Sequence, residues 1–262
     1  MKQDTDMIVR HFGVVDEIEV YPIGDVHLGA AEHMADAWKQ FCDYIISRPH
    51  AYVILIGDLI NNGTRTSVTN IFEETMRPSE QKRMMAEMLK PLRDRIIAII
   101  PGNHEARSGK DADDDPTYDI AVKLDIEDLY RPNTAFIKLQ MGLRQKYSAH
   151  RPAYIFVATH GAGGGIYTGA AVNRNERFGN VIDGLDVLIV GHSHKAHVTK
   201  PMKIVVDARN DKVSQRPYYV VGVGSWMHYG GYALRKMLLP SSSAAQVIRL
   251  TMKGRNISVE TR

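Results

Sequence analysis

Seven short runs rich in Val, Ile and Tyr are spread along the chain, and each has the length and composition of a buried strand. Stretches with apolar residues at near-helical spacing lie between the early runs. This order predicts a β-α-β-α-β first part and a strand-rich second part, with a sheet core and helices outside it. The expected strands cover residues 18–23, 52–56, 96–100, 154–158, 187–190, 218–223 and 247–251.

The helices are expected over residues 35–47, 79–92 and 116–129. Three further segments have loop composition: the acidic stretch 107–115, the glycine-rich stretch 161–169 and the Pro/Ser turn 239–244. The Asp-Ala-Asp-Asp-Asp run within 107–115 is expected to be a solvated loop or a helix N-terminus. The glycine-rich stretch is either a lid or simply a flexible loop.

Composition limits the class of protein. The chain has 262 residues, 44% hydrophobic and 24% charged, with a formal net charge of +3. We expect one domain over residues 1–262, because no repeat or long linker interrupts it. Cys42 is the sole cysteine, so a zinc site built from several thiolates is excluded and a reducing compartment is favoured. With no apolar run long enough to span a bilayer and no secretory signal, a cytoplasmic protein with no membrane partner is expected.

Asp, Asn or His residues stand just beyond five of the predicted strands. Ligands of α/β sheets bind at the carboxyl ends of strands, so we expect these side chains to converge. The residues in question are Asp25 and His27, Asp58, Asn103 and His104, His160, and His192 and His194. Imidazole nitrogens and hard oxygens suit Mn, Fe, Zn and similar divalent ions. Eight such side chains are too many for one ion and enough for two.

The ordered set of motifs closely resembles the calcineurin-like metallophosphoesterases, over about two thirds of the chain. The resemblance implies a four-layer αββα sandwich, in which two mixed sheets are flanked by helices. It assigns Asp25, His27 and His194 to one metal, Asn103, His160 and His192 to a second, and Asp58 to both. It makes His104 the catalytic histidine, and it implies two divalent cations, Mn first, with Fe, Zn, Ni or Mg as alternatives.

The resemblance also implies a reaction, in which a hydroxide bridging two metals attacks phosphorus and His104 protonates the leaving oxygen. Asn61 stands where protein phosphatases carry an Asp that orients this histidine, and its amide is predicted to take over that role. Asn103, Arg65 and Arg107 are the predicted substrate contacts. The phosphatase arginine is replaced by Asn62, which argues against a protein phosphatase.

Three functions follow from this pattern. The Gly-His-x-His motif ending at His194 is closer to the nuclease and cyclic-nucleotide branches, and to small viral or prophage-encoded members, so a phosphodiesterase acting on a nucleotide or nucleic acid comes first. A phosphomonoesterase on a small molecule or nucleotide is the alternative. An inactive scaffold is the third, and would be expected to lack some of the ligands. No Lys/Arg cluster stands out in the sequence, and a nuclease is expected to have a basic groove, so the hypothesis of a nuclease is weakened. The oligomeric state stays open.

Overall fold

The computed structural model describes residues 5–67, 71–142 and 152–261. Its two larger sheets pack face to face. The five-stranded sheet has the order β13-β12-β2-β3-β4, with β2, β3 and β4 parallel and β12 and β13 antiparallel to their neighbours. Its strands are β2 (Glu17–Ile23), β3 (Ala51–Ile56), β4 (Ile96–Ile100), β12 (Gln246–Thr251) and β13 (Ile257–Thr261).

The six-stranded sheet has the order β1-β5-β6-β7-β11-β8 and is also mixed. In it, β6, β7 and β11 run parallel, while β5 and β8 are antiparallel to β6 and β11. Its strands are β1 (Ile8–His11), β5 (Thr134–Gln140), β6 (Ala153–Thr159), β7 (Val187–Val190), β8 (His197–Thr199) and β11 (Tyr219–Gly222). Fully buried aliphatic residues such as Ile54 and Ile97 of one sheet and Ile137 and Ile189 of the other share the core between the sheets.

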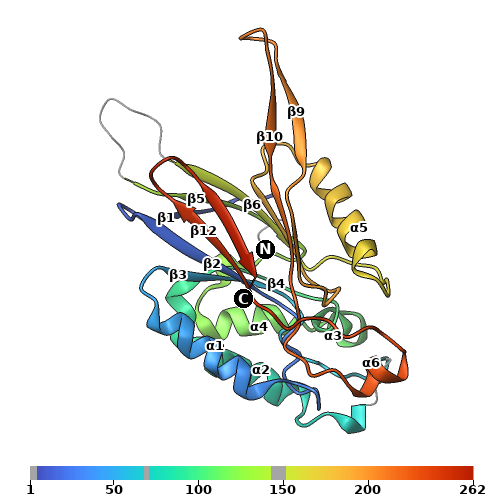
Figure 1. Cartoon of the computed structure of the whole chain (residues 1–262). Coiled ribbons are helices and arrows are strands. Elements are labelled where there is room, and N and C mark those ends of the chain that lie inside the picture. Colours follow the sequence, from blue (N-terminus) through green and yellow to red (C-terminus); the bar gives the residue numbers. More distant parts are fainter. Residues whose placement is uncertain (1–4, 68–70, 143–151, 262) are drawn as a thin grey trace.

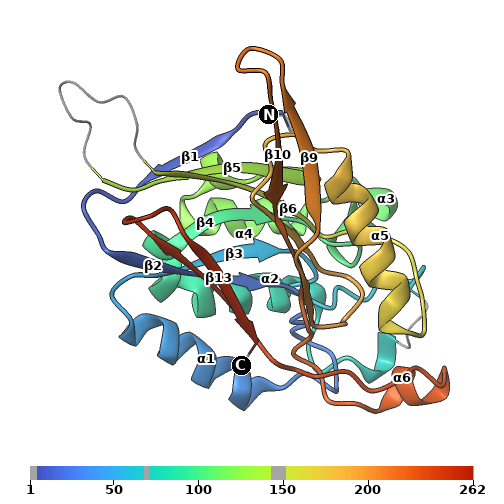
Figure 2. The same cartoon turned by 45° about the horizontal axis from the view of Figure 1, so that its top comes forward.

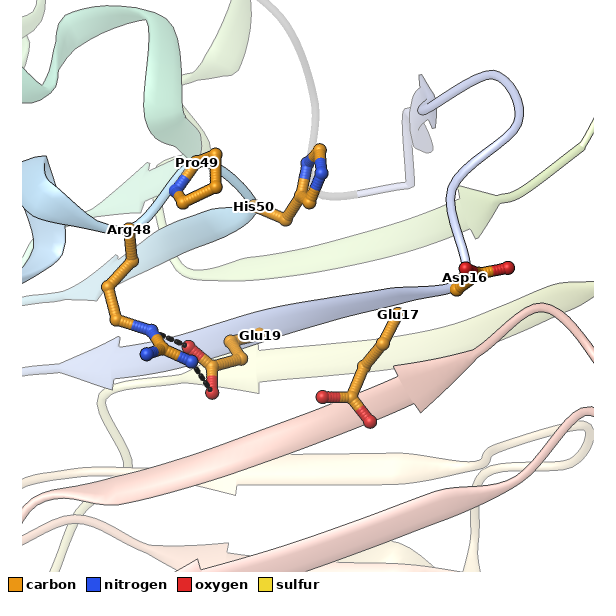
Figure 3. A pocket seen from close by; sticks show the side chains of 6 residues that line it. All are labelled: Asp16, Glu17, Glu19, Arg48, Pro49 and His50. Atoms are coloured by element: carbon orange, nitrogen blue, oxygen red, sulfur yellow. Dashed lines mark hydrogen bonds and ion pairs between the residues drawn. The ribbon is translucent and has the colours of Figure 1, made fainter.

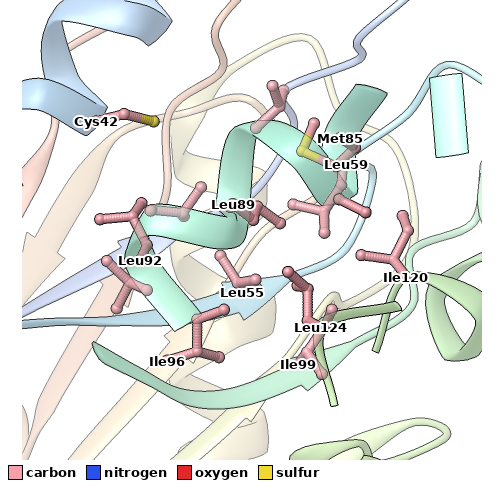
Figure 4. Close-up of a cluster of buried hydrophobic side chains, with 14 of the residues drawn as sticks. Cys42, Leu55, Leu59, Met85, Leu89, Leu92, Ile96, Ile99, Ile120 and Leu124 are labelled. Atoms are coloured by element: carbon pink, nitrogen blue, oxygen red, sulfur yellow. The ribbon is translucent and has the colours of Figure 1, made fainter. Parts of the chain in front are cut away.

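Helices cover both outer faces (Figures 1 and 2). On the five-stranded sheet lie α1 (Ala35–Ser47), α2 (Pro78–Leu89) and α4 (Pro116–Leu124), and α5 (Thr168–Asn180) covers the other sheet. Met85 and Leu89 of α2 pack with Leu55 and Leu59 beneath them (Figure 4). The predicted αββα sandwich is therefore confirmed. The remaining helical elements are η1 (Ile71–Glu73), η2 (Lys90–Arg95), α3 (Glu105–Ala112), η3 (Glu127–Leu129) and α6 (Gly231–Arg235).

All seven predicted strands are present, and α1 has the predicted bounds. The prediction of a loop over residues 107–115 is wrong, because α3 occupies most of it. Asp115 does begin a helix, since its side chain accepts a hydrogen bond from the Tyr118 N–H at the start of α4. In the glycine-rich segment, α5 begins at Thr168.

A third, two-stranded sheet consists of β9 (Met202–Asp207) and β10 (Lys212–Pro217), which were not predicted. Within the described ranges, no helix combines the length and apolar character needed to cross a bilayer. The single domain over residues 1–262 stays a prediction.

Candidate metal centre

Every predicted ligand residue lies just beyond the carboxyl end of a strand. Asp25 and His27 follow β2, Asp58 follows β3, and Asn103 follows β4. On the facing sheet, the parallel neighbours β6 and β7 end before the three remaining histidines, which are His160, His192 and His194. Both sheets therefore deliver their polar strand ends to one rim of the sandwich, as the sequence predicted.

The backbone at this rim is unusual. Five of the residues in question have a left-handed φ: Asp25 (53°), His27 (49°), Asp58 (49°), His192 (66°) and His194 (54°). Non-glycine residues in this region are uncommon and carry a conformational cost, and such positions concentrate at functional sites. The surrounding sheet ends hold this conformation in place, which is the pattern expected where side chains must point at one centre.

Two glycines let the loops after β3 and β4 approach each other. A Cβ atom on Gly57, whose φ is +84°, would lie 2.2 Å from the Gly102 nitrogen. A Cβ atom on Gly102 would lie 2.2 Å from Asp58 Oδ1. Side chains at either position would therefore separate Asp58 from the loop that carries Asn103 and His104.

Asp25, His27 and His194 form the first cluster of ligand-type atoms. His27 Nε2 and His194 Nε2 face each other at 3.2 Å, and His194 Nε2 lies 3.2 Å from Asp25 Oδ1. Even so, Asp25 Oδ1 is buried without a hydrogen bond. A buried carboxylate oxygen without a donor is unfavourable by itself, and a cation placed between Asp25 Oδ1 and the two imidazole nitrogens would satisfy it.

Asp58, His160 and His192 form the second cluster, and Asn103 joins it. Asn103 Oδ1 lies 3.0 Å from His160 Nε2 and 2.6 Å from His192 Nδ1. Asp58 Oδ2 lies 3.3 Å from His160 Nε2 and 3.7 Å from His27 Nε2. Asp58 is thus the carboxylate that faces both clusters. The donor set fits two divalent cations, although ligation itself stays a prediction.

Burial and charge set the protonation of these histidines. Burial lowers the pKa of His27 well below its usual value, and His104 acts in the same direction. Burial likewise lowers the pKa of His192. Burial would also lower the pKa of His160, but the charge of Asp58 and its hydrogen bond outweigh burial and raise the pKa to about 10. The lowered pKa of His27 and of His192 favours the neutral imidazole, which is the form that binds metals.

His104 forms a third group of ligand-type atoms with His27 and Asp58. Its Nε2 lies 3.8 Å from Asp58 Oδ2, and its backbone N–H donates to Asp58 Oδ1 at 2.8 Å. Its Nδ1 lies 2.8 Å from the backbone carbonyl oxygen of Asn61. The predicted role of the Asn61 amide is therefore wrong. That amide donates instead to Glu74 Oε1 at 3.0 Å, and the Asn61 main chain holds the imidazole.

The two predicted substrate arginines have different positions. Arg107 of α3 donates to the Asn61 carbonyl at 3.3 Å and to Ser67 Oγ at 3.4 Å, and it lines the pocket above His104. Burial lowers the pKa of this guanidinium. Arg65 is exposed and does not line that pocket, so the structure does not place it at the site. Arg65 lies in the loop that follows β3. The backbone conformation of a loop sets the direction of its side chains, and a sequence motif does not predict that conformation.

Glu105, which the sequence analysis assigned no role, holds the site together. Its buried carboxylate accepts hydrogen bonds from the backbone N–H groups of Asp58 (2.9 Å), Gly102 (2.8 Å) and Ile60 (3.1 Å). Burial, together with the charge of Asp58, raises its pKa to about 7. Asn62 has a related role, since its amide donates to the His104 carbonyl at 2.8 Å. An acidic residue directly after Asn103 and His104 was the available signal for this role.

The site opens into a pocket of about 510 Å³. Its walls come from residues 163–166, from α5 and from the segment between Ser225 and Ser241. Arg174 of α5 lines it, and its Nε is buried without a hydrogen-bond partner. A second hollow lies at the start of β2, far along the strand from the site, where Arg48 pairs with Glu19 (Figure 3).

Comparison with known families decides the classification. The model of the calcineurin-like phosphoesterase family, Metallophos, matches residues 19–196, which include every predicted ligand. The chain belongs to the calcineurin-like phosphoesterase family. Family membership implies a hydrolase, and the Asp/His clusters of this phosphoesterase are able to hold divalent metals.

More distant similarities are also found. Two DNA polymerase II small subunits from Halobacterium salinarum are each 30% identical over 95 residues, covering 32% of this chain and 17% of theirs. The phosphoesterase thus spans less than a fifth of those relatives' length.

Among solved structures, a predicted phosphoesterase from Streptococcus pneumoniae has a TM-score of 0.38 at 11% identity, covering 95% of this chain and 100% of its own. Vps29 complexed with zinc from Entamoeba histolytica has a TM-score of 0.39 at 14% identity, covering 94% and 98%. NAD nucleotidase from Haemophilus influenzae has a TM-score of 0.42 at 11% identity, covering 93% and 49%.

Proposed function

We propose that this phosphoesterase is a binuclear, metal-dependent phosphodiesterase acting on a nucleotide or nucleic acid. The position of Asp58 carries the proposal. Its Oδ1 accepts the His104 N–H, which leaves Oδ2 facing His27 on one side and His160 on the other. One carboxylate between two clusters of ligand-type atoms is the arrangement that a shared ligand requires.

In this proposal Asp25, His27 and His194 hold one cation, Asn103, His160 and His192 hold the other, and Asp58 binds both. Two divalent cations supply Lewis acidity and a more acidic water. Mn is the first choice, because the set mixes imidazole nitrogen with hard oxygen; Fe, Zn, Ni and Mg are alternatives.

The protein's own groups position the substrate and move the proton. The Asn61 carbonyl accepts from His104 Nδ1, so that Nε2 faces the centre, and the doubly protonated ring would deliver its Nε2 proton to the leaving oxygen. Arg107 lies beside His104 in the pocket, where its guanidinium offers donors to a phosphoryl oxygen. Asn103 is exposed at the rim, and its amide nitrogen is a second donor for substrate.

The pocket lining supports a diester with an organic group on each side of phosphorus. Glu32, Glu73 and Glu74 form part of its wall and disfavour additional negative charge. Met227 and Leu238 supply apolar surface that suits a base or another planar group. The cations that line the pocket, Arg107, Arg174, Lys195 and Arg235, favour the second candidate, a phosphomonoesterase, because a dianion gains more from cations. An inactive scaffold is disfavoured, because the full predicted ligand set comes together.

A substrate comparison with added Mn tests this proposal. Bis-p-nitrophenyl phosphate, p-nitrophenyl phosphate and single-stranded DNA are assayed side by side, with Asp58→Ala and the exposed Asp36→Ala as a matched pair. We expect diester cleavage that is lost in Asp58→Ala and retained in Asp36→Ala. Monoester cleavage without diester cleavage would select the second candidate, and equal activity of both variants would reject the centre. A cytoplasmic location is proposed as well, supported by the unpaired, buried Cys42.

A further inference from the structure

The hairpin of β9 and β10 stands apart from the two larger sheets. Its strands pair with each other along their whole length, from Met202 opposite Pro217 to Asp207 opposite Lys212. Within the described ranges, neither strand joins another sheet. Figures 1 and 2 show the hairpin projecting beyond the body of the molecule. An isolated two-stranded ribbon is only marginally stable in water, so this segment gains from contact with another surface.

One face of this ribbon is apolar and exposed. Side chains alternate along each strand, and directly paired residues share a face. The apolar hairpin face therefore consists of Met202, Ile204, Val206, Val213, Gln215 and Pro217. Four of these side chains are largely exposed: Met202 (54%), Ile204 (74%), Val206 (71%) and Val213 (67%). No charged residue belongs to this face.

The opposite face is tied to the body at its base. Lys203 Nζ donates to the backbone carbonyls of Asn180 and Ile182, at the end of α5. Arg216 donates to the Gly184 carbonyl at 2.9 Å and to Asp186 Oδ1 at 3.0 Å. These contacts fix the orientation of the ribbon relative to the body. They also pair the side chains of Lys203 and Arg216 with groups of the protein itself.

From this geometry we propose that the apolar hairpin face is a homodimer interface, in which the faces of two copies stack on each other. The exposed fractions of these four side chains correspond to roughly 500 Å² of apolar surface per copy. The largest apolar patch on a typical monomer covers ~300–600 Å² and is often functional. Stacking two faces would bury up to about 1,000 Å² of apolar area, which is the size that a specific interface should reach. This proposal is independent of the proposed enzymatic function.

Charge favours a second copy over other partners. A nucleic acid needs cations on the surface that it contacts, and this face has none. A lipid surface is usually met by basic and aromatic side chains beside the apolar patch. Here Lys203 and Arg216 are engaged by the protein itself, and β9 and β10 contain no aromatic residue. Around the turn, the acidic residues Asp207 and Asp211 balance the basic residues Arg209 and Lys212. The turn therefore has no net charge that would repel the turn of a second copy.

Sedimentation velocity over a wide concentration range tests the interface. We expect wild-type protein to dimerise, and Ile204→Glu/Val206→Glu to raise the dimer Kd more than about 100-fold, because each copy would bury two unpaired charges. Val14→Glu is the matched control, since Val14 is 63% exposed in a loop away from the hairpin. Far-ultraviolet circular dichroism checks that each variant is folded. A wild-type monomer at all concentrations, or a dimer equally strong in the double variant, overturns the proposal.

Cross-linking locates the contact. Cys42 is the sole cysteine and is buried, so a cysteine introduced at Gln215 is the one that a short bismaleimide reaches. Gln215→Cys, at the centre of the face, should give cross-linked dimer, and Val14→Cys should not. Cross-linking of both variants alike, or of neither, contradicts stacked faces. If wild type is instead monomeric and sediments with vesicles of three parts phosphatidylcholine to one part phosphatidylserine, the face binds membranes and the proposal is overturned.

Discussion

Replacing Glu105 with glutamine should damage the proposed metal centre without touching a predicted ligand. Oε2 accepts from the Asp58 and Gly102 N–H groups, and Oε1 accepts from Ile60. Glutamine offers one oxygen, so at least one buried N–H loses its acceptor and faces an amide donor. Such a loss costs about 1–3 kcal/mol. For a protein of this size that lowers Tm by roughly 2–10 °C.

The same change should loosen Asp58, because its backbone nitrogen is one of the three donors. Outer-shell substitutions of this kind typically cost ~10–100-fold in metal affinity. Differential scanning calorimetry gives Tm, and Mn titration followed by calorimetry gives the affinity. The control is Glu87→Gln, on the exposed side of α2. If Glu105→Gln matches this control in both measurements, Glu105 does not support the site in the way argued.

Three further changes probe other features. Arg174→Gln should raise KM for bis-p-nitrophenyl phosphate about tenfold and leave kcat within about twofold, since the arginine would bind substrate without reacting; equal KM values for it and the exposed Arg177→Gln contradict this. Gly57→Ala should lower the free energy of unfolding, measured in urea, by well over ~1 kcal/mol. Gly13→Ala is the control, because Gly13 also has a positive φ but open space around it, so only backbone strain lowers its stability. Equal losses in the two variants would show that the close approach of Gly57 to Gly102 is unimportant. Burial would raise the pKa of Glu19, but hydrogen bonds from Arg48 and Tyr21 outweigh burial and lower it below the ordinary value of 4.5. The ionised Glu19 therefore stabilises the fold above pH 4.5, and this stabilisation is lost as the pH falls through the lowered pKa. Glu19→Gln should therefore lower Tm at pH 7 and much less at about pH 3; an equal loss at both values would show that its charge is unimportant.

The sandwich and the convergence of the ligands were readable from the sequence, because both depend on local patterns. Buried parallel strands such as β4 and β7 are continuous apolar runs, and the polar residues directly after them must lie at one rim. The resemblance to a known family added the division into two clusters, which Asp58 joins in the structure.

The rest depends on contacts between distant segments. The loop predicted at residues 107–115 became α3 because Asn62 holds its first turn from the β3 side. The role of Asn61 was assigned to its amide, whereas the His104 ring meets its main-chain carbonyl, a difference that no side-chain pattern records. The helix α5 is polar over much of its length, and β9 and β10 bury few side chains. None of these three elements therefore shows a strong periodic pattern of apolar residues in the sequence.

Metal stoichiometry tests the central claim most directly. Purified protein, stripped of metal and dialysed against Mn, is analysed by elemental mass spectrometry beside Asp58→Ala and Asp36→Ala. We predict two Mn per chain for wild type and for Asp36→Ala, and one or none for Asp58→Ala, because Asp58 faces both clusters. Two Mn retained by Asp58→Ala, or fewer than one bound by wild type, would contradict a binuclear centre shared through Asp58.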